Sequence, residues 1–431
     1  MKFLIKKILI EKSEQNQQIG ISYTFIKWII YGTIIGLLCG IASGIFLYLL
    51  KIATNFRENY KWIILFLPVA GIVTTWLYLK YGKNSSRGNN LILEEIQNKK
   101  EKIPGRMGFL ILITTVISHL FGASVGREGT AVQMGGALSE FVSKILKCNE
   151  RDRRILLMSG ISGGFGSVFG TPLAGAIFGM EISSVGVIKY EALLPCFVSS
   201  FVGNMVARTL MVKHLHYDLG KIPLMTWMVL VKVIIASILF GLVAVFFSRS
   251  MHTIKNLFNT KIKKPYMRPV IGGVIIIIMT LVVQNTMFNG LSEGIIANSF
   301  DTKVPFYVFL GKIFFTVVSL GSGFFGGEVT PIFVTGAAFG NFIGQVMNMP
   351  LSFMAALGLI AVFSGASNAP MACFFLGIEM FGGEGAVYFF MASMISYMYS
   401  GHSGIYTSQV VAIAKSKLLH KHEGEKIKDI E

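Results

Sequence analysis

Apolar residues of this chain occur in long runs that are separated by short polar and basic segments. A helix needs about 20 apolar residues to cross a membrane; several runs are shorter, and others are interrupted by glycine or proline. The pattern predicts tilted and broken membrane helices of mixed length, because backbone breaks at membrane depth are tolerated where they are buried in protein or line a cavity. The runs cover residues 24–50, 62–79, 108–121, 130–146, 155–182, 190–211, 225–248, 268–288, 304–325, 331–347, 352–380, 385–400 and 404–414.

A glycine-rich motif occurs twice, 200 positions apart, at residues 122–136 and 326–337. The copies share a glutamate, Glu128 and Glu328, and a threonine two positions later. Chance agreement is the alternative in a chain with 47 glycines, but it does not account for the aligned glutamate and threonine. Broken helices that carry a carboxylate at matching places in two halves are typical of a transporter site at the interface of inverted repeats.

The repeat extends beyond this motif, since residues 178–182 resemble residues 376–380 at a shift of 198. We therefore predict an all-α polytopic membrane protein with two inverted-topology repeats. The first repeat covers residues 23–212 and the second covers residues 223–414.

Composition supports a membrane protein. The 431 residues are 53% hydrophobic and 14% charged, with a mean hydropathy of +0.64, whereas soluble proteins carry roughly 25% charged residues. The net charge of +17 comes from basic residues between and outside the apolar runs. Such residues determine topology and contact lipid headgroups, so we do not expect nucleic-acid binding. The basic segments are 99–102, 151–154, 261–264 and the tail 415–431.

The two ends of the chain are predicted to be cytoplasmic, on the plasma membrane. Residues 1–22 combine apolar and basic positions, as in an interfacial helix, and lack the long apolar core and cleavage site of a signal peptide. The tail is short, polar and basic.

No metal site, disulfide or cofactor is predicted. The four cysteines are scattered and the histidines lack a full ligand set. The closest pair, His214 and His216, is interpreted as part of a solvated loop between the halves. The cysteines are Cys39, Cys148, Cys196 and Cys373.

Glu128 is the strongest candidate for chemistry. Gly126 and Gly129 flank it just before an apolar run, which predicts a glycine loop at a helix N-terminus, where unpaired N–H groups favour an anion. A carboxylate that is ionised can occupy the anion's own place and a protonated one can leave it, which couples proton to anion movement. The alternative is a structural pair with Arg127, although adjacent residues on a helix do not face each other.

These motifs resemble those of the CLC family of chloride channels and transporters. Residues 126–130, Gly-Arg-Glu-Gly-Thr, resemble the family's Gly-Lys/Arg-Glu-Gly-Pro, and residues 326–331 resemble Gly-Gly-x-Phe-x-Pro. Residues 88–92 stand in the place of Gly-Ser-Gly-Ile-Pro, and Tyr406 stands where the family keeps its pore tyrosine.

Several departures from that pattern resemble the fluoride-specific branch, whose members exchange fluoride for protons. Thr130 replaces the proline, Asn89 replaces the pore serine, and Ile182 stands where proton-coupled members keep an inner glutamate. Glu328 and Thr330 enter the second motif. The resemblance implies anion contacts from Asn89, Asn90, Gly126, Arg127, Gly129, Thr130, Val329, Thr330 and Tyr406.

Some of these residues have equally ordinary interpretations. Glu328 would titrate or help to carry the proton, but acids also favour helix starts. Asn89 and Asn90 could donate to a strongly hydrated ion that needs close donors, and asparagine also favours turns and N-caps. Tyr406 taken alone would be an interfacial tyrosine.

Glu181 and Glu379 end the matching Pro-x-Ala segments, 172–182 and 370–380. We expect them to be structural rather than to take part in transport. The resemblance implies a homodimer with one pathway per subunit and with these segments near the interface.

We therefore predict a fluoride/proton antiporter that exports fluoride. The alternatives are a chloride/proton exchanger and a passive anion channel of the same fold. An intramembrane hydrolase using Glu128 and Glu328 is disfavoured because no nucleophile or metal ligand set accompanies them, so the protein is not expected to be an enzyme.

Overall fold

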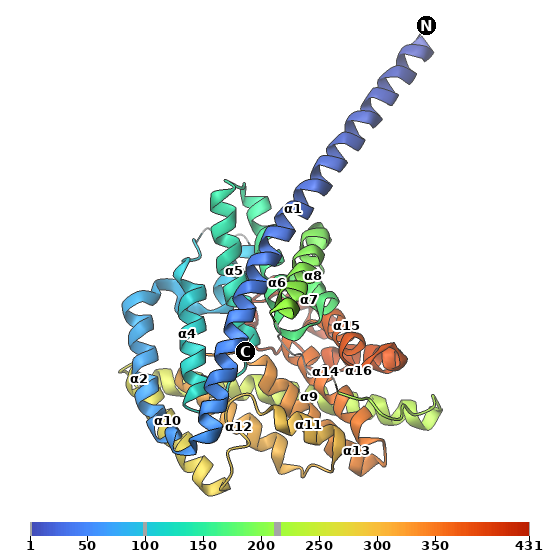
Figure 1. The fold of residues 1–431 in the computed structure, drawn as a ribbon. Coiled ribbons are helices and arrows are strands. Elements are labelled where there is room, and N and C mark those ends of the chain that lie inside the picture. Colours follow the sequence, from blue (N-terminus) through green and yellow to red (C-terminus); the bar gives the residue numbers. More distant parts are fainter. Residues whose placement is uncertain (1, 98–100, 211–216, 431) are drawn as a thin grey trace.

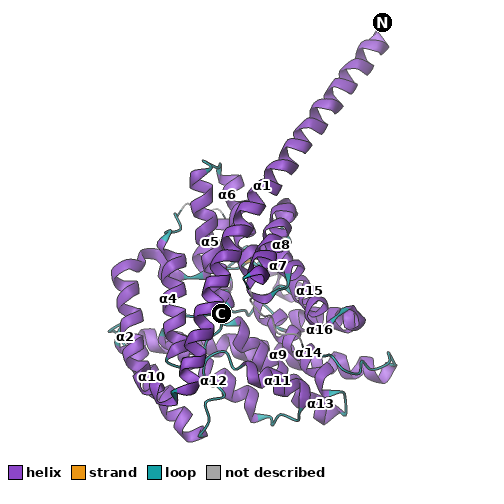
Figure 2. Ribbon diagram, in the orientation of Figure 1, coloured by secondary structure: helices purple, strands orange, loops and turns teal. Residues whose placement is uncertain are grey.

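The computed structural model describes residues 2–97, 101–210 and 217–430, with side chains from residue 17 onwards. The described chain is helical almost throughout (Figures 1 and 2). The first half contains α1 (Lys2–Asn59), α2 (Leu67–Leu77), α3 (Asn89–Ile96), α4 (Arg106–Leu120), α5 (Glu128–Ile145), α6 (Glu150–Phe169), α7 (Pro172–Glu181), β1 (Ser184–Val185) and α8 (Leu193–Thr209).

The second half repeats this order of helices at a shift close to 200. It contains α9 (Trp227–Lys261), α10 (Met267–Val283), α11 (Glu293–Asp301), α12 (Tyr307–Ser322), α13 (Val329–Met347), α14 (Leu351–Ser367), α15 (Pro370–Phe381), α16 (Ala386–Tyr399), β2 (Val410–Val411) and α17 (Ile427–Ile430). The two copies of the glycine motif lead into α5 and α13.

Two long apolar runs are each split into two helices. Gly170, with φ +77°, ends α6 and Pro172 begins α7. In the second half Asn368, with φ +56°, ends α14 and Pro370 begins α15. A residue in the left-handed region stops a helix and proline fits the first turn of the next one, so both breaks are set locally.

Glycines let neighbouring helices approach closely at equivalent places in the two halves. A Cβ on Gly135 of α5 would lie 2.0 Å from the carbonyl oxygen of Gly160 on α6. A Cβ on Gly336 of α13 would lie 2.3 Å from the carbonyl oxygen of Gly358 on α14. Close backbone packing of this kind is common between membrane helices, and it places α5 and α13 firmly in the interior.

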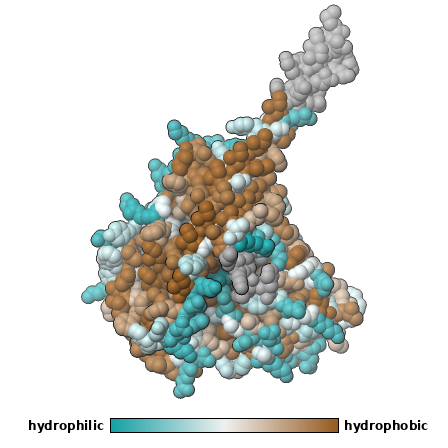
Figure 3. Space-filling model, viewed as in Figure 1, coloured by the Kyte–Doolittle hydropathy of each residue, from teal (hydrophilic) through white to brown (hydrophobic). Residues whose placement is uncertain are grey.

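The outer surface is apolar over much of its height. Figure 3 shows a broad hydrophobic surface between polar ends. Among the described residues, five helical segments are long and apolar enough to cross a membrane: Gln17–Asn59, Lys61–Ile96, Tyr190–Thr209, Trp227–Lys261 and Val329–Met347. These features fit a chain that crosses a membrane several times.

The N-terminal segment is not a separate helix. Helix α1 runs without a break from Lys2 to Asn59, and its start projects away from the body (Figure 1). The boundary predicted at residue 22 therefore does not coincide with a helix end, because no proline or other strong helix breaker stands there. The predicted position of residues 1–22 at a membrane surface stays a prediction.

The last apolar run, 404–414, is not a helix as predicted. Its residues form turns and β2, which pairs in parallel with β1 through Ser184–Val410 and Val185–Val411. The backbone N–H of Ile405 donates to the carbonyl of Ala366 (2.8 Å), so hydrogen bonds to other elements replace those of a helix.

Candidate functional site

The two glycine motifs contact each other through their backbones. The N–H of Gly126 donates to the carbonyl of Gly327 (2.6 Å), and the N–H of Gly327 donates to the carbonyl of Gly126 (2.8 Å), in an antiparallel bridge. A Cβ on Gly327 would lie 2.6 Å from the backbone nitrogen of Gly129. Only glycine permits this approach, which brings the N-termini of α5 and α13 together.

Glu128 is 1% exposed, and its carboxylate lies at the start of the opposite helix, α13. One oxygen accepts from the Thr330 hydroxyl (2.5 Å) and the other accepts from the N–H groups of Thr330 and Arg127 (both 3.1 Å). These donors are of the kind that binds an anion at a helix N-terminus. The carboxylate therefore stands where a small anion could accept the same hydrogen bonds. We call this group of donors the seat.

Arg127 also contacts Glu128, contrary to the argument that neighbours in sequence do not face each other. Its Nε lies 3.5 Å from Glu128 Oε1, and its Nη1 lies 3.0 Å from Glu293 Oε1. The argument fails because Arg127 precedes the first helical residue of α5. The structural pair and a functional role for Glu128 thus coexist.

On one side of the seat lies a cavity of about 1110 Å³, lined by residues of both halves. Four predicted site residues line it: Asn89, Asn90, Glu328 and Tyr406. Its wall also carries the basic side chains Arg87, Arg249, His252, Lys255, Arg268 and Lys428. A concave surface with this excess of positive charge raises the local concentration of anions.

The two asparagines differ in their contacts. Asn89 is the first residue of α3, and its Oδ1 is buried without a hydrogen-bond partner among the described residues. A Cβ on Gly129 would lie 3.2 Å from Asn89 Nδ2, so this side chain reaches the motif. Asn90 Oδ1 instead accepts from the N–H of Ser408 (3.0 Å) and holds the segment after Tyr406.

The threonines differ as well. Thr330 donates to Glu128, whereas the hydroxyl of Thr130 is hydrogen-bonded to the hydroxyl of Thr115 (2.7 Å) on α4. The Thr130 hydroxyl therefore has a structural partner away from the seat. Val329 is the buried first residue of α13 and contributes backbone there.

Glu328 and Tyr406 face the same cavity. Glu328 is the N-cap of α13 but makes no side-chain capping bond, so it is not an ordinary capping glutamate. Lys255 and His252 lie within electrostatic range of it. Tyr406 is 4% exposed and packs edge-on against Phe178, with the two ring centroids 6.4 Å apart. The buried position excludes an interfacial tyrosine.

Several charged residues near the motif were not predicted. Lys312 is fully buried on α12, with its ammonium donating to Ser124 Oγ (2.9 Å), Ser292 Oγ (2.8 Å) and the carbonyl of Gly290 (2.8 Å). A lone lysine in an apolar run is the signal that could have identified it, since a charge at membrane depth is expensive. Glu293 gives no such signal, because it lies in a polar stretch.

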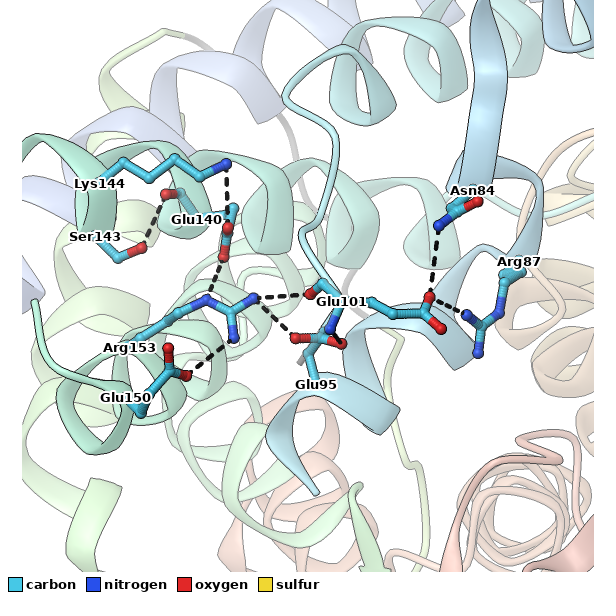
Figure 4. A network of polar contacts seen from close by, with 9 residues as sticks. All are labelled: Asn84, Arg87, Glu95, Glu101, Glu140, Ser143, Lys144, Glu150 and Arg153. Atoms are coloured by element: carbon cyan, nitrogen blue, oxygen red, sulfur yellow. Dashed lines mark hydrogen bonds and ion pairs between the residues drawn. The ribbon is translucent and has the colours of Figure 1, made fainter. Parts of the chain in front are cut away.

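Arg153 was predicted only as part of a basic loop, and the structure shows that it also forms ion pairs with buried acids. Its guanidinium donates to Glu140 (2.7 Å) and Glu95 (2.9 Å), in a network that reaches Glu101 and Arg87 (Figure 4). Glu95 belongs to α3, whose first residue is Asn89. The network ties α3 to α5 and α6 and so helps to position Asn89.

Glu181 and Glu379 cap each other's helices. The carboxylate of Glu181 accepts from the N–H groups of Met371 (3.1 Å) and Ala372 (2.8 Å) at the start of α15. The carboxylate of Glu379 accepts from two N–H groups at the start of α7, those of Leu173 and Ala174 (both 2.8 Å). These contacts agree with the expected structural role. The predicted histidine pair, His214 and His216, lies outside the described residues.

Comparison with known proteins places the chain. The family described as "Voltage gated chloride channel" matches residues 70–401. The chain belongs to this family, the CLC family. Its members are channels and transporters, which agrees with the predicted multi-pass membrane protein.

Individual relatives give finer comparisons with this CLC protein. The "Chloride/fluoride channel protein" of Pseudomonas syringae is 42% identical over 94% of this chain and 91% of the relative. The "H(+)/Cl(-) exchange transporter ClcA" of Vibrio cholerae is 28% identical over 60% of this chain and 58% of that protein.

Solved structures confirm the predicted CLC-type, all-α fold of two inverted repeats. The crystal structure of a CLC-type fluoride/proton antiporter matches with a TM-score of 0.87 and 30% identity, covering 90% of this chain and 98% of that one. A slow cyanobacterial Cl⁻/H⁺ antiporter shares the fold, with a TM-score of 0.76 at 18% identity, over 86% of this chain and 94% of that one.

Proposed function

We propose that this CLC protein exports fluoride from the cytoplasm in exchange for protons. The observation that carries the proposal is the carboxylate of Glu128 in the seat, where Thr330 supplies both an N–H and an O–H. Ionised Glu128 accepts these bonds and excludes the anion. Protonated Glu128 is neutral and yields the seat to fluoride, so that each ion moves only when the other has made room.

Fluoride is small and strongly hydrated, and a selective site must replace its water with close donors. Thr330 provides two donors, and the amide of Asn89 reaches the motif from the side of the cavity. The relative named for both chloride and fluoride and the structural relative described as a fluoride/proton antiporter support the same ion.

Glu328 lies on the cavity side of the seat, next to Lys255 and His252. We propose that this carboxylate takes part in proton movement between the cavity and Glu128, since Ile182 leaves no carboxylate at the inner position used by other proton-coupled members. Its basic neighbours would offset its charge when fluoride passes.

We further propose that both termini are cytoplasmic and that the cavity opens to the cytoplasm. The C-terminal end of α9 and the tail both line the cavity, and basic segments next to membrane helices favour the cytoplasmic side. The protein would reside in the plasma membrane as a homodimer with one pathway per subunit. No nucleic acid or cofactor enters the proposal.

Reconstitution in liposomes tests the proposal. An imposed proton gradient should drive fluoride uphill, with proton flux recorded at the same time and chloride added as a competitor. Glu128→Gln mimics the protonated residue and should conduct fluoride without moving protons. Glu128→Ala should likewise lose proton coupling.

The alternatives give different results. A passive channel, the function in the name of the 42% identical relative, cannot move fluoride against its gradient. A chloride/proton exchanger would prefer chloride in competition. Proton pumping by Glu128→Ala on a fluoride gradient would show that the role assigned to Glu128 is wrong.

A further inference from the structure

Next to the seat, and not among the residues that line the cavity, one guanidinium lies between two carboxylates. Arg127 Nη1 lies 3.0 Å from Glu293 Oε1, and Arg127 Nε lies 3.5 Å from Glu128 Oε1. The Arg127 side chain is 17% exposed and that of Glu293 is 33% exposed. The Glu293 side chain is therefore partly reached by solvent, although its oxygen that faces Arg127 is buried, whereas Glu128 is buried as a whole.

Glu293 is held in place by the segment that precedes it. The buried ammonium of Lys312 donates to Ser292 Oγ (2.8 Å) and to the carbonyl of Gly290 (2.8 Å). Ser292 itself has φ +61° just before α11 begins at Glu293. A fully buried lysine that binds this turn through several donors restricts where Glu293 can point.

The same segment is attached to the loop that leads into the first glycine motif. The side-chain amide of Asn289 donates to the carbonyl of Gly122 (3.0 Å), and the N–H of Gly290 donates to the carbonyl of Ala123 (3.1 Å). The turn before Glu293 and the loop before Arg127 thus form one unit, so the contact between these two side chains does not depend on a free surface loop.

We propose that Glu293 is a positioning residue for Glu128. It holds the Arg127 guanidinium partly away from Glu128 and thereby sets the external acidity at which Glu128 leaves the seat. This inference rests on the proposed fluoride/proton exchange. A cation shared by two carboxylates stabilises each ionised form less than it would stabilise one alone, and the charge of Glu293 itself opposes that of Glu128.

Tyr217 belongs to the same cluster. Its hydroxyl is buried without a hydrogen-bond partner among the described residues, and it lies within electrostatic range of Glu293 and Arg127. Its ring stacks on Phe300 of α11 (4.8 Å). The other titratable or charged groups that face the cluster from neighbouring elements are Arg57 on α1, His119 on α4, Lys312 on α12, Glu328 before α13, and Tyr406.

The test is the dependence of fluoride flux on external pH in liposomes that contain the full chain. In Glu293→Gln the Arg127 guanidinium interacts with the carboxylate of Glu128 alone, so a lower external pH is needed before Glu128 leaves the seat. We expect the external pH of half-maximal flux to move in the acid direction by about half a unit or more. Glu293→Asp keeps the charge and should shift the profile less than Glu293→Gln does.

Asp301→Asn is the matched control, since Asp301 is an exposed acid on the same helix. It removes the same charge and should leave the profile in place. The inference is overturned if Glu293→Gln superimposes on the wild type, or if Asp301→Asn shifts the profile equally. A wild type that moves no fluoride on a proton gradient would refute the proposed exchange itself, which is a different failure. Elution of each variant as a single species in detergent establishes that it is folded. If Glu293→Gln does not fold, Glu293→Ala removes the same charge and takes its place, with the same two outcomes.

Discussion

Thr330 binds the carboxylate of Glu128 with both its backbone and its side chain. The N–H belongs to the start of α13 and would remain after any substitution except proline, whereas the hydroxyl is specific to serine and threonine. The side-chain bond is therefore the part of the seat that mutation can remove cleanly.

Thr330→Val should weaken fluoride binding and reduce fluoride flux by roughly tenfold, because one hydrogen bond to a charged group is worth about 1.5–3 kcal/mol. The size of the residue is kept and the backbone N–H is unchanged. Flux at several fluoride concentrations, with and without chloride, gives the measurement.

Thr335→Val is the control for that experiment. Thr335 lies on the same helix and is also buried, but its hydroxyl donates to the carbonyl of Pro331 (2.8 Å) within the helix. It should transport normally. Wild-type flux and ion preference in Thr330→Val would contradict the assignment of the seat.

At the scale of residues, the motifs predicted Glu128, Thr330 and Gly126 as site residues because their chemistry is visible in a short stretch of sequence. The structure brings the two motifs together. Glu293 was missed because its contact with Arg127 depends on which segments meet in space. Lys312 was missed although a lone lysine in an apolar run is a signal that the sequence itself carries. Thr130 matched the motif, yet its hydroxyl bonds to Thr115, and that partner lies on another helix.

At the scale of elements, the antiparallel bridge between Gly126 and Gly327 joins the start of α5 to the start of α13. Gly327→Ala should break it, since the added Cβ would lie 2.6 Å from the nitrogen of Gly129. Backbone cannot move aside as a flexible side chain can. We expect destabilisation of about 1–3 kcal/mol and at least a tenfold loss of fluoride flux, measured by thermal unfolding in detergent and by liposome assay.

Gly294→Ala is the control for this substitution, because no heavy atom lies within 4 Å of the Cβ it would add. It should lower neither stability nor flux. Equal behaviour of the two alanine variants would mean that the close approach of the two motifs is not needed.

The reciprocal caps of α7 and α15 lead to a prediction about stability alone. Glu181→Ala should destabilise the protein by about 1–2 kcal/mol, the usual loss for a helix cap, because two N–H groups of α15 lose their acceptor. Glu379→Ala should do the same to α7. Chemical or thermal unfolding measures both.

Glu384→Ala removes an exposed glutamate close to the end of α15 and serves as the reference for this pair. Proton coupling should survive in all three variants. Loss of coupling in Glu181→Ala at normal stability would contradict a purely structural role.

Local signals predicted most elements but not their ends. The apolar runs marked the helices, and proline after glycine or asparagine would have located the breaks before α7 and α15. The segment 404–414 was misassigned because its partners, β1 and the carbonyl of Ala366, are distant in the sequence. An apolar run alone does not distinguish a short helix from a buried extended segment.

At the scale of the whole molecule, the C-terminal tail folds back against the wall of the cavity. Lys415 donates to Asn368 Oδ1 (2.5 Å) and to the carbonyl of Tyr397 (2.7 Å), and Lys426 pairs with Glu94 (2.8 Å). Leu419 and Lys428 line the cavity. A tail that was predicted only as a basic extension is thus part of the folded protein.

His402 should make the docking of this tail sensitive to pH. Burial, together with Lys415 and His422, lowers the pKa of His402 below its usual value of 6.5. The folded state therefore holds it neutral, and the released state binds a proton more readily. As pH falls below about 6.5 the docked form loses stability. The protection factors of the amides in residues 415–430, which are corrected for the intrinsic exchange rate at each pH, should therefore fall.

His402→Gln should remove most of that effect, whereas His420→Gln should leave it intact. His420 is on the tail itself, but its side chain is 56% exposed and pairs with Glu423. Protection of the tail that does not change with pH in the wild type would contradict the role given to His402.

The pair of backbone hydrogen bonds between Gly126 and Gly327 also limits how the two halves can move. The two repeats cannot move apart as rigid bodies at this place unless these two hydrogen bonds break in every transport cycle. For the proposed exchange, this favours a mechanism in which individual side chains such as Glu128 rotate while the two halves keep their relative position. A transporter that works in this way would stay active when cross-links are introduced between the two halves elsewhere.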